Sequence, residues 1–337
     1  MESIKILAIE TSCDETSAAV VENGTKVLSN VIYSQIDIHR LYGGVVPEIA
    51  SRNHIVKIDD VVSAALDDAN CRLSDISAVA VTYGPGLVGA LLVGLNFSKA
   101  LAYGADLPLV GVHHISGHIA SNYLENPNFT PPFIALIVSG GHTQIIYVKN
   151  YNNFEILGAS LDDAAGEAYD KVARCLGLAY PGGVEIDKLA KEGDPLAINF
   201  PRAMIGEGSF NFSFSGLKSS VINHLNSAKM AGRNVVPADI AASFQQAVVD
   251  VLTKKSLGAC KITGVNKLAV AGGVACNSYL RAALTKECDE LGITLNIPAP
   301  VFCTDNAAMI ASAGYYLYKE GKFSDLSLNA VPSLPLA

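Results

Sequence analysis

The chain has 337 residues, of which half are hydrophobic and 17% charged, so it can bury more than one core. Its net charge of -8 argues against a dedicated nucleic-acid binder, because phosphate contacts require basic surface. The seven cysteines include no CxxC pair, which argues against both a disulfide framework and a cysteine-rich zinc site. Met1–Lys5 leads into a strand-like run without a signal-peptide pattern, so we expect a cytoplasmic protein.

The first part of the chain predicts three strands, then a strand, a helix, a strand and a helix. In chain order these are Ile6–Glu10, Ala18–Glu22, Lys26–Tyr33, Ala78–Thr82, Val88–Tyr103, Leu109–Val112 and His118–Leu124. The segment Ile76–Ser98 contains no charged residue and resembles a membrane span in hydropathy. Its Gly84-Pro85-Gly86 turn breaks a helix, however, so we predict a buried strand followed by a buried helix and no membrane insertion.

The second part repeats this order of elements at low sequence identity, after a proline-rich linker at 125–132. Its elements are Phe133–Val138, Gln144–Val148, Phe154–Gly158, an inserted region 182–236, helix Pro237–Lys261, strand Lys267–Ala271, helix Asn277–Leu291, strand Ile293–Ile297 and helix Ala307–Tyr318. A duplicated unit predicts two similar α/β domains that face each other across a cleft, with ligands at the carboxyl ends of strands. Two unrelated α/β halves are the alternative.

A histidine pair is the first candidate site. His114 and His118 are four residues apart, which places both imidazoles on one face of a helix. Histidines that cap a helix or pack in a cleft are the ordinary alternative. The corresponding turn of the second repeat contains Asp305, which we expect to face the pair across the cleft. Two histidines and one carboxylate leave coordination positions open and suit Fe(2+), with zinc or manganese as alternatives.

Glycine turns that end or follow predicted strands form the second candidate site. They are Ser139-Gly140-Gly141, Gly182-Gly183 and Gly272-Gly273. Glycine lets backbone N–H groups approach phosphate oxygens, although tight turning alone would also explain them. The turns match neither the P-loop nor the dinucleotide-binding pattern. Asp187, shortly after the second turn, can accept hydrogen bonds from sugar hydroxyls.

Two further segments have open interpretations. Asp163, Glu167 and Asp170 fall on one face of a predicted helix, which indicates either a ligand-facing helix or a solvated acidic face. Asn211–Lys218 alternates aromatic residues with serines, as a strand does. Its Lys218 either meets a phosphate or lies in solvent beside an edge strand.

These segments together resemble the tRNA threonylcarbamoyladenosine-forming transferase family, formerly described as sialoglycoprotein endopeptidases. The similarity runs in order over nearly the whole chain, through Glu10–Thr16, Tyr42–Glu48, Gly84–Leu87, the histidine turn, Ser139–Thr143, Asp162–Lys171, Phe212–Lys218, Ala271–Val274 and Cys303–Asn306. It implies the duplicated actin/Hsp70/sugar-kinase (ASKHA) fold, with 1–130 plus about 305–337 as one half and 131–304 as the other. Ser116 departs from the family, since many members carry an acidic residue there.

The resemblance implies an N6-L-threonylcarbamoyladenine synthase that transfers the threonylcarbamoyl group of L-threonylcarbamoyl-AMP to N6 of adenosine 37, in tRNAs reading codons that begin with A. It implies one Fe(2+) per subunit, with zinc as an alternative, on His114, His118 and Asp305. It implies contacts to an ATP- or AMP-type nucleotide by Ile137, Val138, Ser139, Gly140, Gly141, Asp170, Gly183, Asp187 and Asn277. The implied partners are the tRNA anticodon loop, a paralogous inactive subunit of the same fold and a small P-loop ATPase. No side chain is assigned as a catalytic acid or base.

Three other functions remain as alternatives. A zinc-dependent metalloendopeptidase would need a glutamate directly after the first histidine of the pair, but Ile115 stands there. A small-molecule kinase of the same fold needs an acid that deprotonates a hydroxyl and has no use for a histidine pair. A non-catalytic, nucleotide-dependent interaction module would share the fold without any turnover.

Overall fold

The computed structural model describes residues 3–206 and 208–336, and the chain divides into two compact units. Unit 1 comprises Met1–Pro131, Lys149–Phe154 and Pro298–Ala337, and unit 2 comprises Pro132–Val148 and Glu155–Ile297. Within the described residues, no helix is both long and apolar enough to cross a membrane.

Unit 1 is built on a five-stranded sheet with the strand order β3-β2-β1-β4-β5. The strands are β1 (Lys5–Glu10), β2 (Glu15–Glu22), β3 (Lys26–Ser34), β4 (Ala78–Gly84) and β5 (Leu109–His113). β1 pairs antiparallel with β2 and parallel with β4. Residues on both faces of β1, β2 and β4 are almost all buried, which explains their continuous apolar sequences.

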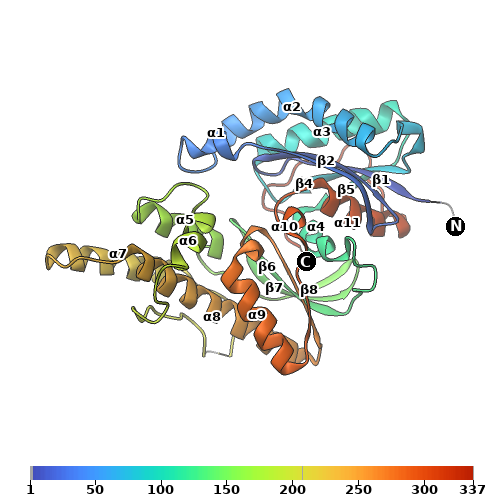
Figure 1. The fold of residues 1–337 in the computed structure, drawn as a ribbon. Coiled ribbons are helices and arrows are strands. Elements are labelled where there is room, and N and C mark those ends of the chain that lie inside the picture. The colour runs from blue at the N-terminus through green and yellow to red at the C-terminus, as the bar shows by residue number, and fades with distance from the viewer. Residues whose placement is uncertain (1–2, 207, 337) are drawn as a thin grey trace. The chain divides into compact units, whose positions relative to one another are not determined.

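Helices cover both faces of this sheet (Figure 1). α2 (Pro47–Asp68) and α3 (Val88–Gly104) pack on one face, whereas α4 (His114–Ala120) and α11 (Ala307–Lys319) lie on the other. Two short helices, α1 (Ile36–Arg40) and α10 (Pro300–Cys303), precede α2 and α11. α11 contacts β1, β2, β4 and β5, so the C-terminal end of the chain completes the core of unit 1.

Unit 2 repeats this topology with a five-stranded sheet in the order β10-β9-β6-β7-β8. The strands are β6 (Phe133–Val138), β7 (Thr143–Asn150), β8 (Asn153–Ala159), β9 (Lys267–Ala271) and β10 (Thr294–Asn296). β6 pairs antiparallel with β7 and parallel with β9, as β1 pairs with β2 and β4. The internal repeat predicted from the sequence is therefore confirmed at the level of sheet topology.

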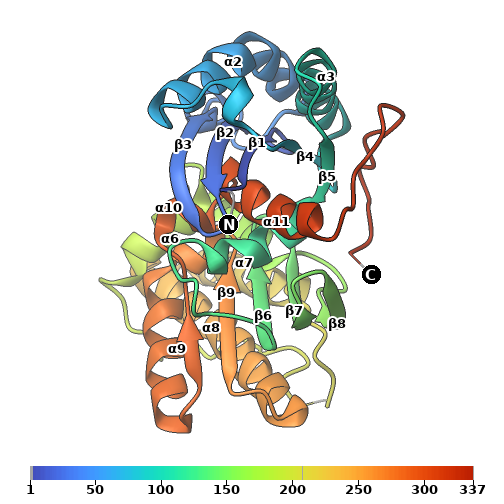
Figure 2. The ribbon, with the colours of Figure 1, turned by 90° about the vertical axis from the view of Figure 1, so that its right-hand side faces the viewer.

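The helices of unit 2 are α5 (Ala165–Cys175), α6 (Gly182–Ala190), α7 (Ser215–Met230), α8 (Pro237–Thr263) and α9 (Ser278–Leu291). α8 packs on β6 and β9, and α9 packs on β10 (Figure 2). α8 begins with Pro237 and ends before the left-handed Gly264, so both ends follow from local sequence.

The strand-like interpretation of Asn211–Lys218 is wrong. Only Phe212 forms an isolated bridge, to Ser160, and helix α7 begins at Ser215. Asp162 explains the change, because its carboxylate accepts hydrogen bonds from the N–H groups of Phe214 and Ser215 and from neighbouring serine hydroxyls. These bonds satisfy N–H groups at the start of α7 that have no partner within the helix.

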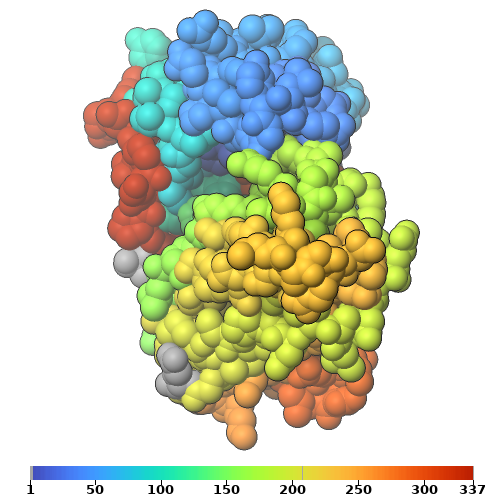
Figure 3. All heavy atoms as spheres, turned by 90° about the vertical axis from the view of Figure 1, so that its left-hand side faces the viewer, coloured from blue at the N-terminus to red at the C-terminus, as the bar shows by residue number. Residues whose placement is uncertain are grey.

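After α11 the chain continues over the surface of unit 1. Figure 3 shows this C-terminal segment in red, beside the teal residues of the same unit. The N–H of Ser324 donates to the carbonyl of Leu109 at 2.8 Å, and the N–H of Val331 donates to the carbonyl of Tyr83 at 2.8 Å. The segment therefore runs along β5 and the end of β4.

Candidate metal centre and glycine-turn site

Helix α4 presents two buried imidazoles. It begins at His114, four residues earlier than the sequence predicts, and therefore contains both histidines. The ring centroids of His114 and His118 lie 4.7 Å apart with an 80° angle between the planes. His113 caps the helix, because its Nδ1 accepts the N–H of Ile115 at 3.1 Å. The four-residue spacing thus places both imidazoles on one face of α4, as predicted from the sequence.

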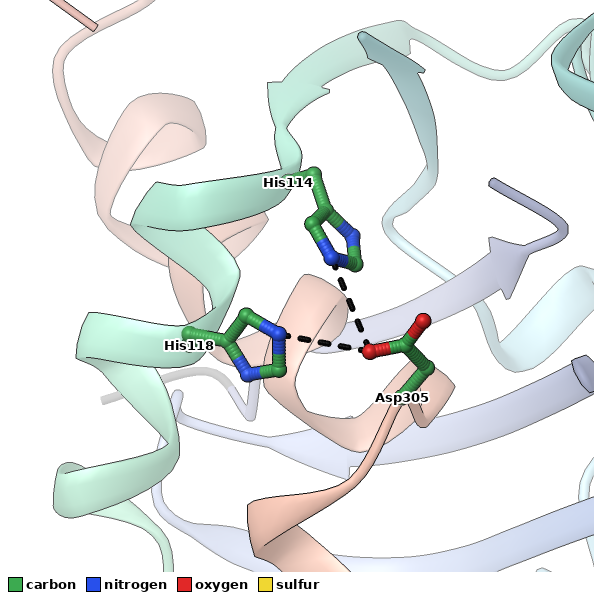
Figure 4. Close-up of side chains that lie close together, drawn as sticks. All are labelled: His114, His118 and Asp305. Atoms are coloured by element: carbon green, nitrogen blue, oxygen red, sulfur yellow. Dashed lines mark ion pairs between the residues drawn. The ribbon is translucent and has the colours of Figure 1, made fainter. Parts of the chain in front are cut away.

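Asp305 completes this cluster (Figure 4). Its Oδ1 lies 3.6 Å from Nε2 of His114 and 3.3 Å from Nε2 of His118. All three residues belong to unit 1, whereas the repeat pattern predicts Asp305 on the opposite side of a cleft. The prediction is wrong in this respect because α11 packs on the first sheet and brings the preceding turn, which contains Asp305, to α4.

Glu10 and Ser12 orient the ring of His114. The fully buried Glu10 carboxylate ends β1, lies 3.1 Å from Nδ1 of His114, and accepts the hydroxyl of Thr82 at 2.6 Å. The Ser12 hydroxyl lies 3.1 Å from the same Nδ1. Engaging Nδ1 in this way leaves Nε2 directed at Asp305, as in a carboxylate–histidine–metal arrangement. Glu10 was not among the predicted site residues, although a carboxylate that ends a buried strand was a usable signal.

Burial and the neighbouring charges shift the pKa values of His114, Glu10 and His118. Burial opposes a charge on His114, but the carboxylates of Asp305 and Glu10 outweigh burial and raise the pKa of His114 to about 9. Burial acts to raise the pKa of Glu10, but His114 reverses this and lowers it. Burial lowers the pKa of His118, so this ring is neutral at pH 7, the form that ligates metals.

The three side chains fit a divalent cation. Their potential ligand atoms all lie within 4.8 Å of one another. Metal bonds of about 2.0–2.2 Å to nitrogen and oxygen place neighbouring ligand atoms about 3.0–3.5 Å apart. The separations of 3.3 and 3.6 Å between the imidazoles and Asp305 approach this range. Three protein ligands would leave coordination positions for a substrate.

In unit 2, the loop after β6 is assembled by backbone contacts. The N–H of Gly166 donates to the carbonyl of Ser139 at 3.2 Å. A Cβ atom at Gly166 would lie 2.5 Å from that carbonyl oxygen, and one at Gly272 would lie 2.4 Å from the carbonyl oxygen of Val138. The start of α5 and the turn after β9 therefore touch this loop directly, which only glycine permits.

Gly140 and Gly141 are open, because a Cβ atom at either position would meet nothing within 4 Å. Ile137 pairs in register with Ala271, so β6 and β9 end side by side. Parallel strands that end together form the edge where α/β proteins bind ligands. The predicted ligand residues Ile137, Val138, Ser139, Gly140 and Gly141 lie at this edge.

Asp170 engages the N-terminal end of α6. Its Oδ1 accepts the N–H of Gly182 at 2.7 Å and it also accepts the N–H of Gly183. Burial nevertheless raises the pKa of Asp170 above its ordinary value. The N–H groups of the Gly182-Gly183 turn are thus used within the chain. At Gly140 and Gly141, by contrast, there is open space where a Cβ atom would lie.

Asp187 and Asn277 connect α6 to the start of α9. Both carboxylate oxygens of Asp187 lie 2.9 Å from the hydroxyl of Ser278, which can donate to either. Asn277 caps α9 by accepting the N–H of Leu280 at 2.9 Å, and it donates to Gln245 at 2.7 Å. The structure therefore brings these two predicted ligand residues together, with Asn277 already committed to two internal hydrogen bonds.

Of the three acidic residues on the predicted face at 163–170, two pair with lysines and one binds the start of α6. Asp163 lies between Lys171 at 2.9 Å and Lys218 at 3.1 Å, and Glu167 pairs with Lys171. Burial acts to raise the pKa of Asp163, but the two lysines lower it. Asp170 instead turns to α6. Lys218 is thus engaged by Asp163 rather than lying free in solvent.

Comparison with known proteins identifies the family. A family model described as tRNA N6-adenosine threonylcarbamoyltransferase matches residues 26–312. A protein of that name from Clostridium botulinum is 58% identical over 335 residues, covering 99% of this chain and 98% of its own length. Another protein of that name, from Clostridioides difficile, is 57% identical over 336 residues, covering 100% of this chain and 99% of its own length.

Solved structures confirm the fold. Full-length HypF superposes with a TM-score of 0.64 at 17% identity, covering 95% of this chain and 56% of that chain. Component A of the Acidaminococcus fermentans (R)-2-hydroxyglutaryl-CoA dehydratase superposes with a TM-score of 0.54 at 17% identity, covering 95% of this chain and 99% of that chain. These neighbours and the repeated sheet topology show the duplicated actin/Hsp70/sugar-kinase fold. The relatives' common name does not favour the endopeptidase, kinase or interaction-module alternatives. The family match and the chain-long identity together show that this chain belongs to the tRNA N6-adenosine threonylcarbamoyltransferase family, and it is a transferase that modifies N6 of an adenosine in tRNA.

Proposed function

We propose that the chain transfers the threonylcarbamoyl group of L-threonylcarbamoyl-AMP to adenosine 37 of tRNAs reading codons that begin with A, with one Fe(2+) on His114, His118 and Asp305. The single observation that carries this proposal is the cluster of two buried imidazoles and one half-buried carboxylate in a chain of this family. Two imidazole nitrogens and one carboxylate oxygen, with open positions left over, suit Fe(2+), and zinc is the alternative. His114 would release its proton when the cation binds.

The reaction is an acyl transfer in which N6 attacks the carbamoyl carbon, the bond from that carbon to the phosphate oxygen breaks, and AMP leaves with the bonding electrons. N6 gives up one proton, which passes to solvent or to the departing phosphate. The exocyclic amine is a weak nucleophile, so the site must stabilise charge that develops on the carbonyl oxygen. A bound divalent cation would supply this by polarising the carbonyl. His114, His118 and Asp305 would hold the cation, while Glu10 keeps the His114 ring oriented.

The donor is already activated as an anhydride, so the proposal needs no enzyme nucleophile. Cys13 follows Ser12 and is close enough for the charge of Asp305 to act on its thiol. Burial, together with Asp14, Asp305 and Glu15, raises the pKa of Cys13 well above its ordinary value. The thiol is therefore protonated at neutral pH and a poor nucleophile, which supports direct transfer.

We further propose that the edge of unit 2 binds an ATP- or AMP-type nucleotide such as the adenylate part of the donor. The contacts would come from Ile137, Val138, Ser139, Gly140, Gly141, Asp170, Gly183, Asp187 and Asn277. The open backbone at Gly140 and Gly141 supports phosphate contacts through N–H groups, and Asp187 suits a ribose hydroxyl. HypF, which has the same fold, is described in a phosphate- and nucleotide-bound form.

The charge of the chain bears on its partners. A net charge of -8 is unfavourable for binding a tRNA anticodon loop, because each phosphate contact needs a cation. We propose that a paralogous inactive subunit of the same fold and a small P-loop ATPase assist the transfer reaction in the cytoplasm.

The proposed halves of the fold are 1–130 with about 305–337, and 131–304.

The decisive test is nucleoside analysis of tRNA from cells that lack the gene and carry either the wild-type chain or the His118→Ala variant. Wild type should restore threonylcarbamoyladenosine and the variant should not, although it accumulates as a folded protein. In parallel, purified chain stripped of metal should regain transferase activity when Fe(2+) is added back, in the presence of its partners. Full activity from stripped protein, or from His118→Ala, would refute the metal assignment.

A further inference from the structure

The C-terminal strap, defined as residues Val331–Leu334, crosses the ends of β4 and β5. The N–H of Val331 donates to the carbonyl of Tyr83 at 2.8 Å, and the carbonyl of Pro332 accepts the N–H of Gly86 at 3.1 Å. The carbonyl of Leu334 accepts a hydrogen bond from Nε2 of His113 at 3.1 Å. Three backbone groups of the strap are therefore bound to the last residues of β4, to the loop after it and to the residue before α4.

The strap and the β4 loop are in backbone contact. A Cβ atom at Gly84 would lie 2.2 Å from the carbonyl oxygen of Val331, so only glycine accommodates the strap at this point. Most strap residues are nevertheless exposed. Because the strap buries little apolar surface, its hydrogen bonds to specific atoms are its main contribution to the structure.

His113 connects the strap to the helix that presents the metal-binding histidines. A neutral imidazole has one N–H donor and one acceptor nitrogen. Nε2 donates to the carbonyl of Leu334, which leaves Nδ1 to accept the N–H of Ile115 in the first turn of α4. The two bonds together select one tautomer and hold the ring between the strap and α4.

A second connection reaches His114 through the β4 loop. Gly86, which donates to the strap, approaches Ser12 so closely that a Cβ atom would lie 2.6 Å from the Ser12 carbonyl oxygen. The same carbonyl accepts the N–H of Leu87 at 2.8 Å, and the Ser12 hydroxyl lies 3.1 Å from Nδ1 of His114. The strap therefore supports the metal centre from two directions.

We propose that His113 and the C-terminal strap are positioning elements that hold α4 and Ser12 in the geometry required for metal binding. This inference rests on the proposed metal function of His114, His118 and Asp305. Neither His113 nor the strap is assigned a contact with the metal or the substrate. Loss of the strap should therefore weaken metal binding and alter the coordination geometry, while the sheet of unit 1 stays folded.

Two truncations test the strap. A chain ending at Ala330 lacks the strap, whereas a chain ending at Leu334 keeps all of its hydrogen bonds and is the matched control. Co(2+), whose visible absorption reports ligand number and geometry, is titrated into each metal-free chain. We expect about tenfold weaker binding and a changed spectrum for the chain ending at Ala330, the lower end of the loss seen when outer partners of metal ligands are removed. The chain ending at Leu334 should behave as full length.

Substitutions at His113 give an independent test that leaves the strap in the chain. His113→Ala removes both the cap and the bond to Leu334, whereas His113→Asn restores a helix-capping acceptor without reaching the strap. We expect His113→Ala to match or exceed the loss of Co(2+) affinity in the chain ending at Ala330, and His113→Asn to recover part of it. Thermal unfolding of the metal-free chains monitors folding separately.

The outcomes separate the two proposals. If full-length protein does not bind Co(2+), or binds it equally well after His118→Ala, the metal function itself fails. If full-length protein binds Co(2+) through His118 but the chain ending at Ala330 and His113→Ala bind it with the same affinity and spectrum, the strap has no positioning role. Should the truncated chain fail to fold, the two His113 variants decide the question.

Discussion

The candidate metal centre of unit 1 and the candidate glycine-turn site of unit 2 lie at equivalent strand ends. The first is made of side chains and the second of backbone. In unit 1, β1 ends in the buried Glu10, and β5 leads into the buried imidazoles of α4. In unit 2, β6 and β9 lead into glycine turns whose backbones touch. One topology therefore supports a site of charged side chains and a site of bare backbone.

This difference determines how each site should fail. A side-chain site loses function when a donor atom is removed, because the remaining buried groups are left uncompensated. A backbone site tolerates changes of side chain but fails when a Cβ atom is added where chains touch, or where a ligand must approach. Substitutions in the two sites should therefore differ in what they impair.

The largest effect is expected from removal of a metal ligand. Asp305→Ala should abolish metal binding and reduce transferase activity by about a hundredfold or more, since a Lewis-acid metal contributes several kcal/mol. Metal content by mass spectrometry and threonylcarbamoyladenosine formation measure the two effects. His224→Ala, which changes a histidine of unit 2 far along the chain on α7, is the control and should retain both properties. An active, metal-free Asp305→Ala chain would contradict the prediction.

The second prediction concerns pH and the metal-free chain. A pKa of His114 that rises from 6.5 to about 9 on folding is worth about 3 kcal/mol of stability. Because the folded pKa is raised, this stabilisation is complete below about pH 6.5 and is lost as the pH rises through about 9. Urea unfolding in the presence of a chelator, between pH 6 and 9.5, should show the decline.

His114→Gln is the reference for that experiment, because it removes the titrating ring and retains a polar side chain. The difference in unfolding free energy between the two chains should shrink as the pH rises. A difference that stays constant across the range would mean that Asp305 and Glu10 do not stabilise the charged imidazole.

In unit 2 the contrast predicts sensitivity to an added methyl group. Gly272 has a φ of +98° and a Cβ atom there would lie 2.4 Å from a carbonyl oxygen, whereas one at Gly273 would meet nothing within 4 Å. Gly272→Ala should therefore cost about 1–3 kcal/mol of unfolding free energy, and Gly273→Ala far less. Chemical unfolding of the two chains makes the comparison, and equal stabilities would contradict it.

At Gly140 we expect an added methyl group to leave stability unchanged and to weaken only nucleotide binding. An added Cβ atom meets nothing within 4 Å, so Gly140→Ala should unfold at the wild-type temperature. If the loop binds phosphate through its backbone, the methyl group should hinder that approach and weaken binding of a fluorescent AMP analogue by about tenfold. Unchanged nucleotide affinity in this variant would remove the loop from the proposed site.

Much of the fold could be predicted because its signals are local. The order of strands and helices follows from apolar runs separated by glycine and proline, and α8 follows from Pro237 and Gly264 at its ends. The shared face of His114 and His118 follows from their spacing alone. Helix α2 was not predicted, although Pro47 begins it and its buried residues recur every three or four positions. Its packing on β2 and α3 stabilises it in the fold.

The order of elements, the histidine pair and the positions of the glycine turns could be predicted, because each is marked by residues that are close in the chain. The duplicated topology followed from the repetition of that order. The family resemblance had already grouped Asp305 with the histidines, and the packing of α11 shows how it reaches them. The fold added that Glu10 and Ser12 orient His114, and that Asp162 makes a strand-like segment the start of α7. These contacts join residues far apart in the chain, and they exist only because burial of the sheets brings those segments together.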